Sequence, residues 1–89
     1  MEKISLLRKR IDEIDEQILR FLKERIDVCE NIGTIKREHE LPVKDPSREN
    51  EQYMRITELA SKLGLDPQEV RDVYQKIIAM SIRAQERES

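Results

Sequence analysis

The sequence predicts an all-α protein, built from one long helix and two shorter helices. Apolar residues recur at alternating intervals of three and four from Ile4 to Ile35, which is the spacing of a helix that presents one stripe to a partner. Two later segments each open on an Asp-Pro pair, Asp45-Pro46 and Asp66-Pro67, and no segment shows the alternation of a strand. We therefore expect three helices in a single domain that covers residues 1–89.

The first helix is too long to bury its apolar stripe within one copy of the chain. From about Ser5 to Glu38 it would be roughly 50 Å long, whereas a compact globule of this chain length would be about 30 Å across. We therefore expect at least a dimer. Gly33 lowers helix propensity, but Ile35 keeps the stripe in phase, so we expect the helix to continue past a close approach by another backbone or a ligand. The stripe consists of Ile4, Leu7, Ile11, Ile14, Ile18, Phe21, Arg25, Val28, Ile32 and Ile35.

The two later helices begin and end at local sequence signals. Pro42 cannot continue the first helix without losing a backbone hydrogen bond, and Asp45 can cap a second helix that runs to about Leu63. Gly64 supplies the left-handed residue that commonly follows a helix, and Asp66 can cap the third helix. The expected buried faces are Tyr53, Ile56, Ala60 and Leu63 on the second helix and Val70, Val73, Tyr74, Ile77, Ile78 and Ile82 on the third, with Ser81 and Gln85 at its edge.

The composition argues against several classes of protein. Lys and Arg (17) nearly balance Asp and Glu (19), so the net charge of −2 does not suggest a nucleic-acid binder. Cys29 and His39 are the only residues of their kinds, so we expect no disulfide framework and no metal site within one chain. There is no apolar run of signal-peptide or membrane-span length, and we therefore expect a soluble cytoplasmic protein with no membrane partner.

The charged member of the apolar stripe is the first functional clue. Arg25 stands where the pattern calls for a hydrophobe, and a buried arginine is costly unless an anion or a carboxylate meets it. Lys36 follows eleven residues later, on nearly the same face, so a small anion could lie between the two. Arg8 is seventeen residues before Arg25, roughly 25 Å along the helix, and could reach the same anion only from another subunit.

Each candidate also has a simpler structural explanation. Arg25 could pair with an acid such as Asp15 of another helix, whereas Arg8 and Lys36 read as solvated residues. The remaining polar candidates could be helix-end or surface groups; these are Asp45, Glu49, Ser81 and Gln85. The only cysteine, Cys29, could be a small core residue, and the only histidine, His39, a solvated one. Spacing alone thus supports a helical dimer with a possible anion site.

Five segments together resemble a known family. They stand in that family's order and spacing and span nearly the whole chain. The sequence is similar to the all-helical AroQ class of chorismate mutases, which implies an intertwined homodimer of three-helix chains with two identical sites shared between subunits. The segments are Leu7 to Asp15, Glu24-Arg25, Gly33 to Lys36, Pro42 to Glu49 and Ser81 to Gln85.

The resemblance implies that chorismate is the substrate and assigns roles to the cations. Arg25 and the partner's Arg8 would pair with its two carboxylates. Lys36 would bridge a carboxylate and the ether oxygen, and Gln85 would donate to that same oxygen. The reaction breaks the ether C–O bond while a C–C bond forms, so no cofactor, metal or nucleophile is implied; holding the flexible arm and stabilising charge on the ether oxygen suffice.

The resemblance also assigns the polar residues around the second helix. Asp45 and Glu49 would hold the ring hydroxyl, with Glu49 counted among the catalytic residues, and Arg48 and Ser81 would be further polar contacts near the carboxylates and ring. Conversion of chorismate to prephenate would place the enzyme in phenylalanine and tyrosine biosynthesis. Two alternatives stay open: an isochorismate-pyruvate lyase of the same fold, and a non-catalytic helical dimerisation or regulatory module, which would have no use for Arg25 on the stripe.

Overall fold

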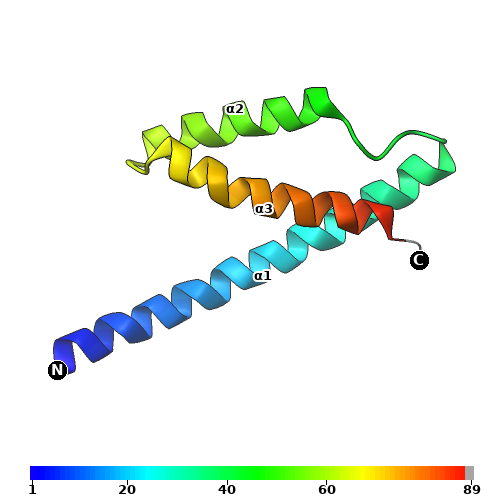
Figure 1. Cartoon of the computed structure of the whole chain (residues 1–89). Coiled ribbons are helices and arrows are strands. Elements are labelled where there is room, and N and C mark those ends of the chain that lie inside the picture. Colours follow the sequence, from blue (N-terminus) through cyan, green and yellow to red (C-terminus); the bar gives the residue numbers. More distant parts are fainter. Residues whose placement is uncertain (88–89) are drawn as a thin grey trace.

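The computed structural model describes residues 1–87 and consists of three α-helices joined by two short connections (Figure 1). They are α1 (Glu2–Glu38), α2 (Pro46–Lys62) and α3 (Pro67–Glu86). No strand occurs among the described residues, so the all-α prediction is confirmed. The expected boundaries were close, and α1 continues through Gly33 as predicted.

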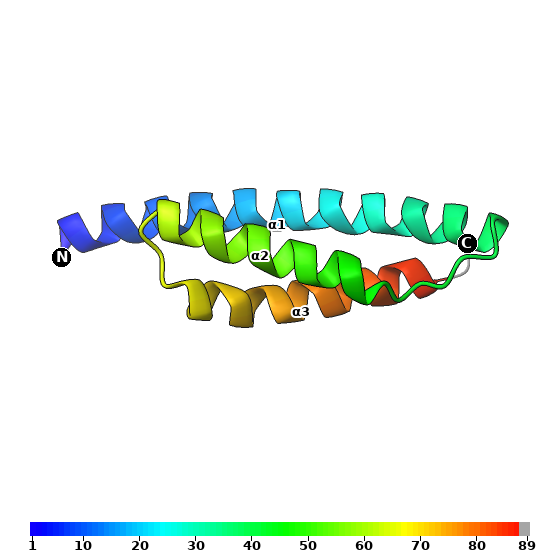
Figure 2. The same cartoon turned by 90° about the horizontal axis from the view of Figure 1, so that it is seen from above.

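The helices form an elongated body in which α3 lies against both of the others. The chain measures 57 × 29 × 15 Å, and α1 runs along its length (Figures 1 and 2). Helix α3 packs on the C-terminal half of α1 and on α2, whereas α1 and α2 have no backbone contact with each other. The N-terminal half of α1 extends away from both partners in Figure 1. This arrangement leaves a space between α1 and α2 that only side chains can fill.

Local capping fixes where the two shorter helices begin. The Asp45 carboxylate accepts a hydrogen bond from the backbone N–H of Arg48 at 3.1 Å, and Asp66 accepts one from Gln68 at 2.9 Å. Each cap is followed by a proline in the first turn, where the missing backbone N–H of proline costs no helical hydrogen bond. Gly64 has a φ of 76°, as expected for the left-handed residue after α2. The capping predictions for both aspartates are therefore confirmed.

The core of a single chain is small and lies where α3 meets the other helices. Cys29, Ile56, Ala60, Ile78 and Ala84 form its apolar part, which confirms the core position of the cysteine. The buried faces were predicted too broadly in two places. Leu63 and Val73, near the turn from α2 to α3, are 67% and 58% exposed. The physical reason is that α1 diverges from the turn between α2 and α3 and does not pack on that end of the two helices (Figure 1).

Gly33 marks the closest approach of two helix backbones. A Cβ atom placed on it would lie 2.6 Å from the Cα and 2.7 Å from the carbonyl carbon of Gln85. Carbon atoms that are not bonded prefer separations of about 3.5–4.0 Å, so only glycine fits here. The expectation of a close approach is confirmed, and the approaching backbone is that of α3.

Candidate active site

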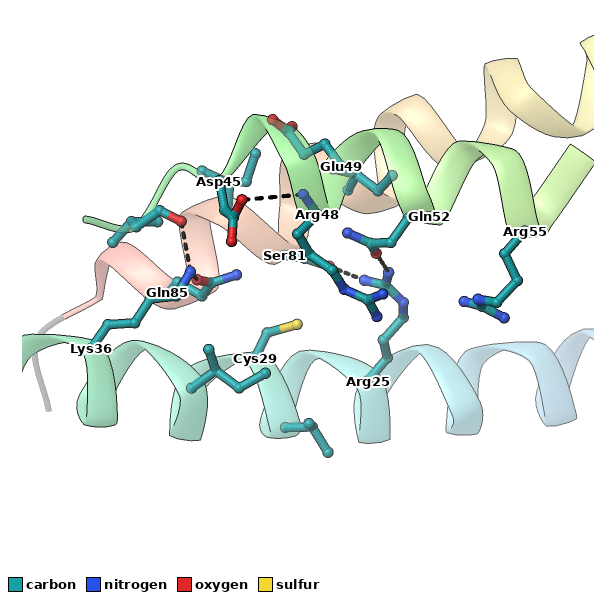
Figure 3. Close-up of a pocket in the computed structure, with 15 residues that line it drawn as sticks. Arg25, Cys29, Lys36, Asp45, Arg48, Glu49, Gln52, Arg55, Ser81 and Gln85 are labelled. Carbon is teal, nitrogen blue, oxygen red and sulfur yellow. Dashed lines mark hydrogen bonds between the residues drawn. The ribbon is translucent and has the colours of Figure 1, made fainter. Parts of the chain in front are cut away.

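A cavity of about 360 Å³ lies between α1 and α2, with α3 closing its third side (Figure 3). Pockets for small molecules begin at about 300 Å³ and are mostly apolar with a few placed polar groups. Here the walls combine aliphatic side chains with a concentration of charged and amide groups. The lining residues are Arg25, Val28, Cys29, Ile32 and Lys36 of α1, Val43 of the connection, Asp45 with Arg48, Glu49, Gln52 and Arg55 of α2, and Ile78, Ser81, Ile82 and Gln85 of α3.

The structure brings seven of the eight residues named from the sequence to this one cavity. The seven come from all three helices and from the cap of α2: Arg25, Lys36, Asp45, Arg48, Glu49, Ser81 and Gln85. Arg8 is the exception. It is exposed on the N-terminal half of α1 and does not line the cavity of its own chain. Its part in a site of the partner subunit stays a prediction.

Arg25 is held at one end of the cavity by two neutral groups. Its Nη1 donates to the Ser81 hydroxyl, and its Nη2 donates to Oε1 of Gln52 at 2.7 Å. Arg25 takes part in none of the ion pairs found within residues 1–87. The two bonds use two of the five N–H donors of a guanidinium, so the rest can bind an anion with the positive charge intact.

Ser81 lies within the buried face of α3 rather than at the edge of that face, so that expectation was wrong. The residue is only 5% exposed because it lies where α3 packs toward Arg25. Its hydroxyl donates to the backbone carbonyl of Ile77 at 2.9 Å and accepts from Arg25. Since its only proton is engaged, Ser81 acts in this arrangement as an acceptor that orients the arginine.

Lys36 and Gln85 meet at the other end of the cavity. The Lys36 ammonium donates to the Val43 carbonyl and to Oε1 of Gln85, both at 2.8 Å. Lysine can only donate, so the amide oxygen of Gln85 must face it and the amide nitrogen remains a donor. The simpler alternative for Lys36, an ordinary solvated residue, does not hold, because α3 and the connection before α2 partly enclose its side chain.

Two further contacts fix the backbone of Gln85. Its carbonyl accepts a hydrogen bond from Arg37 Nη1 at 2.9 Å, and its Cα lies against Gly33. The side chain of Gln85 is thus anchored from α1 on both its backbone and its amide oxygen. A donor fixed in this way loses little freedom when a ligand binds.

Two carboxylates stand on the α2 side of the cavity. One oxygen of Asp45 caps α2, as described, and Glu49 is half-buried one turn further on. Arg48 lies between them in the sequence and pairs with Glu51 at 3.2 Å, and its side chain reaches from α2 toward Arg25 (Figure 3). The cavity therefore carries four cationic side chains and two carboxylates, a net formal charge of +2.

Comparison with known proteins identifies the family. Residues 7–86 match the family model described as chorismate mutase type II. The chain belongs to this family. It is 43% identical over 82 residues to the bifunctional chorismate mutase/prephenate dehydratase of Aquifex aeolicus (strain VF5), with 89% of this chain but only 23% of that protein covered.

Two further relatives are similar over most of their length. The chain is 35% identical over 78 residues to the chorismate mutase of Methanocaldococcus jannaschii, covering 88% of this chain and 79% of that protein. A solved structure of a conserved hypothetical protein from Pyrococcus furiosus superposes with a TM-score of 0.75 at 34% identity, covering 96% and 97% of the two chains. The type II chorismate mutase fold therefore extends over nearly all of this chain.

Two polar residues of this chorismate mutase-family cavity, Gln52 and Arg55, were not predicted from the sequence. Both were detectable in principle. Asp45, Arg48 or Glu49, Gln52 and Arg55 recur at intervals of three and four, so they share one face of α2. Because the apolar residues of α2 lie elsewhere on the helix, attention to the apolar stripe alone overlooks this polar face.

Other ionisable groups lie outside the cavity. His39 is exposed at the C-cap of α1, as expected. On the exposed surface of α1, Asp27 accepts a hydrogen bond from Lys23 at 2.7 Å, and this contact raises the pKa of the lysine. Within residues 1–87 there is no cluster of three His, Cys, Asp or Glu side chains suited to a metal ion, and no helix there has the length and apolar character to cross a membrane.

Proposed function

We propose that this chain is a chorismate mutase, an isomerase that converts chorismate to prephenate in phenylalanine and tyrosine biosynthesis. The observation that carries the proposal is a small cavity with a net formal charge of +2, in a chain of the type II chorismate mutase family. Chorismate carries two carboxylates, so its charge complements that of the cavity. The names of the Aquifex and Methanocaldococcus relatives support the same activity.

The arginines of the site would hold the substrate in a reactive conformation. Arg25 is anchored to Ser81 and Gln52 and keeps its remaining N–H groups for a carboxylate. Arg48 would contribute a further polar contact from α2. Fixing both carboxylates restrains the flexible enolpyruvyl arm over the ring, so part of the entropic cost of the rearrangement is met on binding.

Lys36 and Gln85 would stabilise the transition state. As the ether bond breaks, negative charge grows on the ether oxygen, and donors placed there lower the barrier. Lys36 makes two hydrogen bonds within the chain and has a third N–H available, and the Gln85 amide nitrogen is a donor at any ordinary pH. Asp45 and Glu49 would hold the ring hydroxyl from the α2 side.

We also propose that the enzyme works as a cytoplasmic homodimer with shared sites. The nine apolar residues of the α1 stripe are 38–71% exposed in one chain, and exposed apolar side chains gathered on one face favour an interaction site. A second copy laid along this stripe would cover it. It would also bring the partner's Arg8 to the cavity, where it would bind the second carboxylate beside Arg25.

The decisive experiment is an assay of the purified chain with identification of the product. We expect chorismate to disappear with formation of prephenate. Isochorismate is tested in parallel for release of pyruvate, which would instead identify an isochorismate-pyruvate lyase. If neither substrate reacts while the protein is folded by circular dichroism, the proposed activity is wrong and a non-catalytic helical module is favoured.

A further inference from the structure

Gln52 lines the cavity, but the family resemblance assigns it no role. It lies on the cavity face of α2, one turn after Arg48, and Figure 3 shows its side chain reaching from α2 toward Arg25 on α1. The amide oxygen accepts from Arg25 Nη2 at 2.7 Å. Among the hydrogen bonds drawn in Figure 3, only this one joins α2 directly to α1, whose backbones do not contact each other.

The bond fixes which way the Gln52 amide points. A guanidinium has donors only, so the acceptor oxygen must face Arg25, and the amide nitrogen points to the side of this bond, into the cavity (Figure 3). That nitrogen donates to no group among residues 1–87, and no side-chain nitrogen or oxygen there is buried without a partner. The amide nitrogen is therefore open to solvent or to a molecule bound in the cavity.

The neutrality of Gln52 matters as much as its position. A carboxylate here would form an ion pair with Arg25 and would compete with an incoming anion. An amide accepts the hydrogen bond and leaves the full positive charge of the arginine for the ligand. Ser81 does the same from α3, so Arg25 is oriented from two helices without being neutralised.

We propose that Gln52 is a substrate-binding residue, which orients Arg25 through its amide oxygen and donates its amide N–H to the carboxylate that Arg25 binds. The inference rests on the proposed function, since the carboxylate is that of chorismate. Both effects act on the substrate carboxylate, whose charge does not change during the rearrangement. Gln52 therefore contributes to binding of substrate and transition state alike, and its loss should raise KM more than it lowers kcat.

The test compares two variants at this position with a matched control. Gln52→Met keeps the length of the side chain but removes the acceptor and the donor, and we expect KM to rise about 10- to 100-fold with kcat within about threefold of wild type. Gln52→Glu keeps the acceptor but adds a charge, and we expect a larger rise in KM at pH 7.5. Gln75→Met, on the exposed surface of α3 outside the cavity, should match wild type.

Inhibition by prephenate supplies a binding measurement that does not depend on turnover. The inhibition constant should rise in parallel with KM for both Gln52 variants. Unchanged KM and inhibition constants in Gln52→Met, or binding by Gln52→Glu as tight as by Gln52→Met, would overturn the inference. Failure of the wild type to convert chorismate would instead refute the proposed function, so the two failures are distinguishable.

Discussion

Gly33→Ala is predicted to damage both the packing and the activity of this protein, although alanine is the better helix former. The added Cβ would lie 2.6 Å from the Cα of Gln85, whereas ordinary carbon contacts need about 3.5 Å. The obstructing atoms belong to the backbone of α3 and cannot rotate away. The two helices must therefore separate by about 1 Å at this point.

The stability and the activity should respond differently to this separation. Alanine gains up to about 1 kcal/mol in helix propensity, and overpacking costs about 1–3 kcal/mol, so the net loss of stability is about 0–2 kcal/mol. The activity should fall further. The Lys36 ammonium lies 2.8 Å from the amide oxygen of Gln85, and the separation of the helices would move Gln85 relative to it. A misplacement of about 1 Å can lower a rate about 100-fold.

The assay measures kcat for chorismate and the thermal unfolding midpoint, with Gly64→Ala as a matched control. Gly64 has a φ of 76°, so alanine there is strained by about 1–2 kcal/mol, but a Cβ would meet no atom within 4 Å. The control should therefore lose stability and keep its kcat. If Gly33→Ala retained the kcat of wild type, the argument that this contact positions Gln85 would be refuted.

Three further predictions concern the charged and amide groups of the site. Arg25→Ala should lower kcat/KM about 100-fold or more while the protein stays folded. The control Arg20→Ala, which removes an exposed arginine paired with Glu16, should match wild type. Retained activity in Arg25→Ala would exclude a ligand role for Arg25. Gln85→Glu should be active only in acid, because glutamate donates to the ether oxygen only when protonated and as a carboxylate repels the charge that develops there. A pH–rate profile equal to that of wild type would contradict this. The Arg8→Ala and Arg25→Ala variants should each be inactive, but equal amounts unfolded and refolded together should regain roughly a quarter of wild-type activity. Half of the dimers are then mixed, and each mixed dimer has one intact site of two. No recovery with mixed dimers present would mean that the site is not shared.

The helices and their ends follow from interactions that are local in the sequence. The carboxylates of Asp45 and Asp66 accept hydrogen bonds from backbone N–H groups two or three residues later. The spacing of the α1 stripe identifies one face of that helix. Such interactions depend on few degrees of freedom, so sequence patterns predict them well. The burial of Cys29 and the close approach at Gly33 were also correctly expected.

The sequence by itself determined the helical class, the helix boundaries and most of the polar residues that could form a site. Only the tertiary structure decided which of them meet. Arg25 reaches Gln52 across 27 residues of chain and Ser81 across 56, so these pairs depend on the crossing of three helices. The same crossing buries Ser81 and leaves Val73 exposed. Periodicity identifies the faces of a single helix, but the angle and register between helices come from side chains packing across long sequence separations, which no local pattern contains.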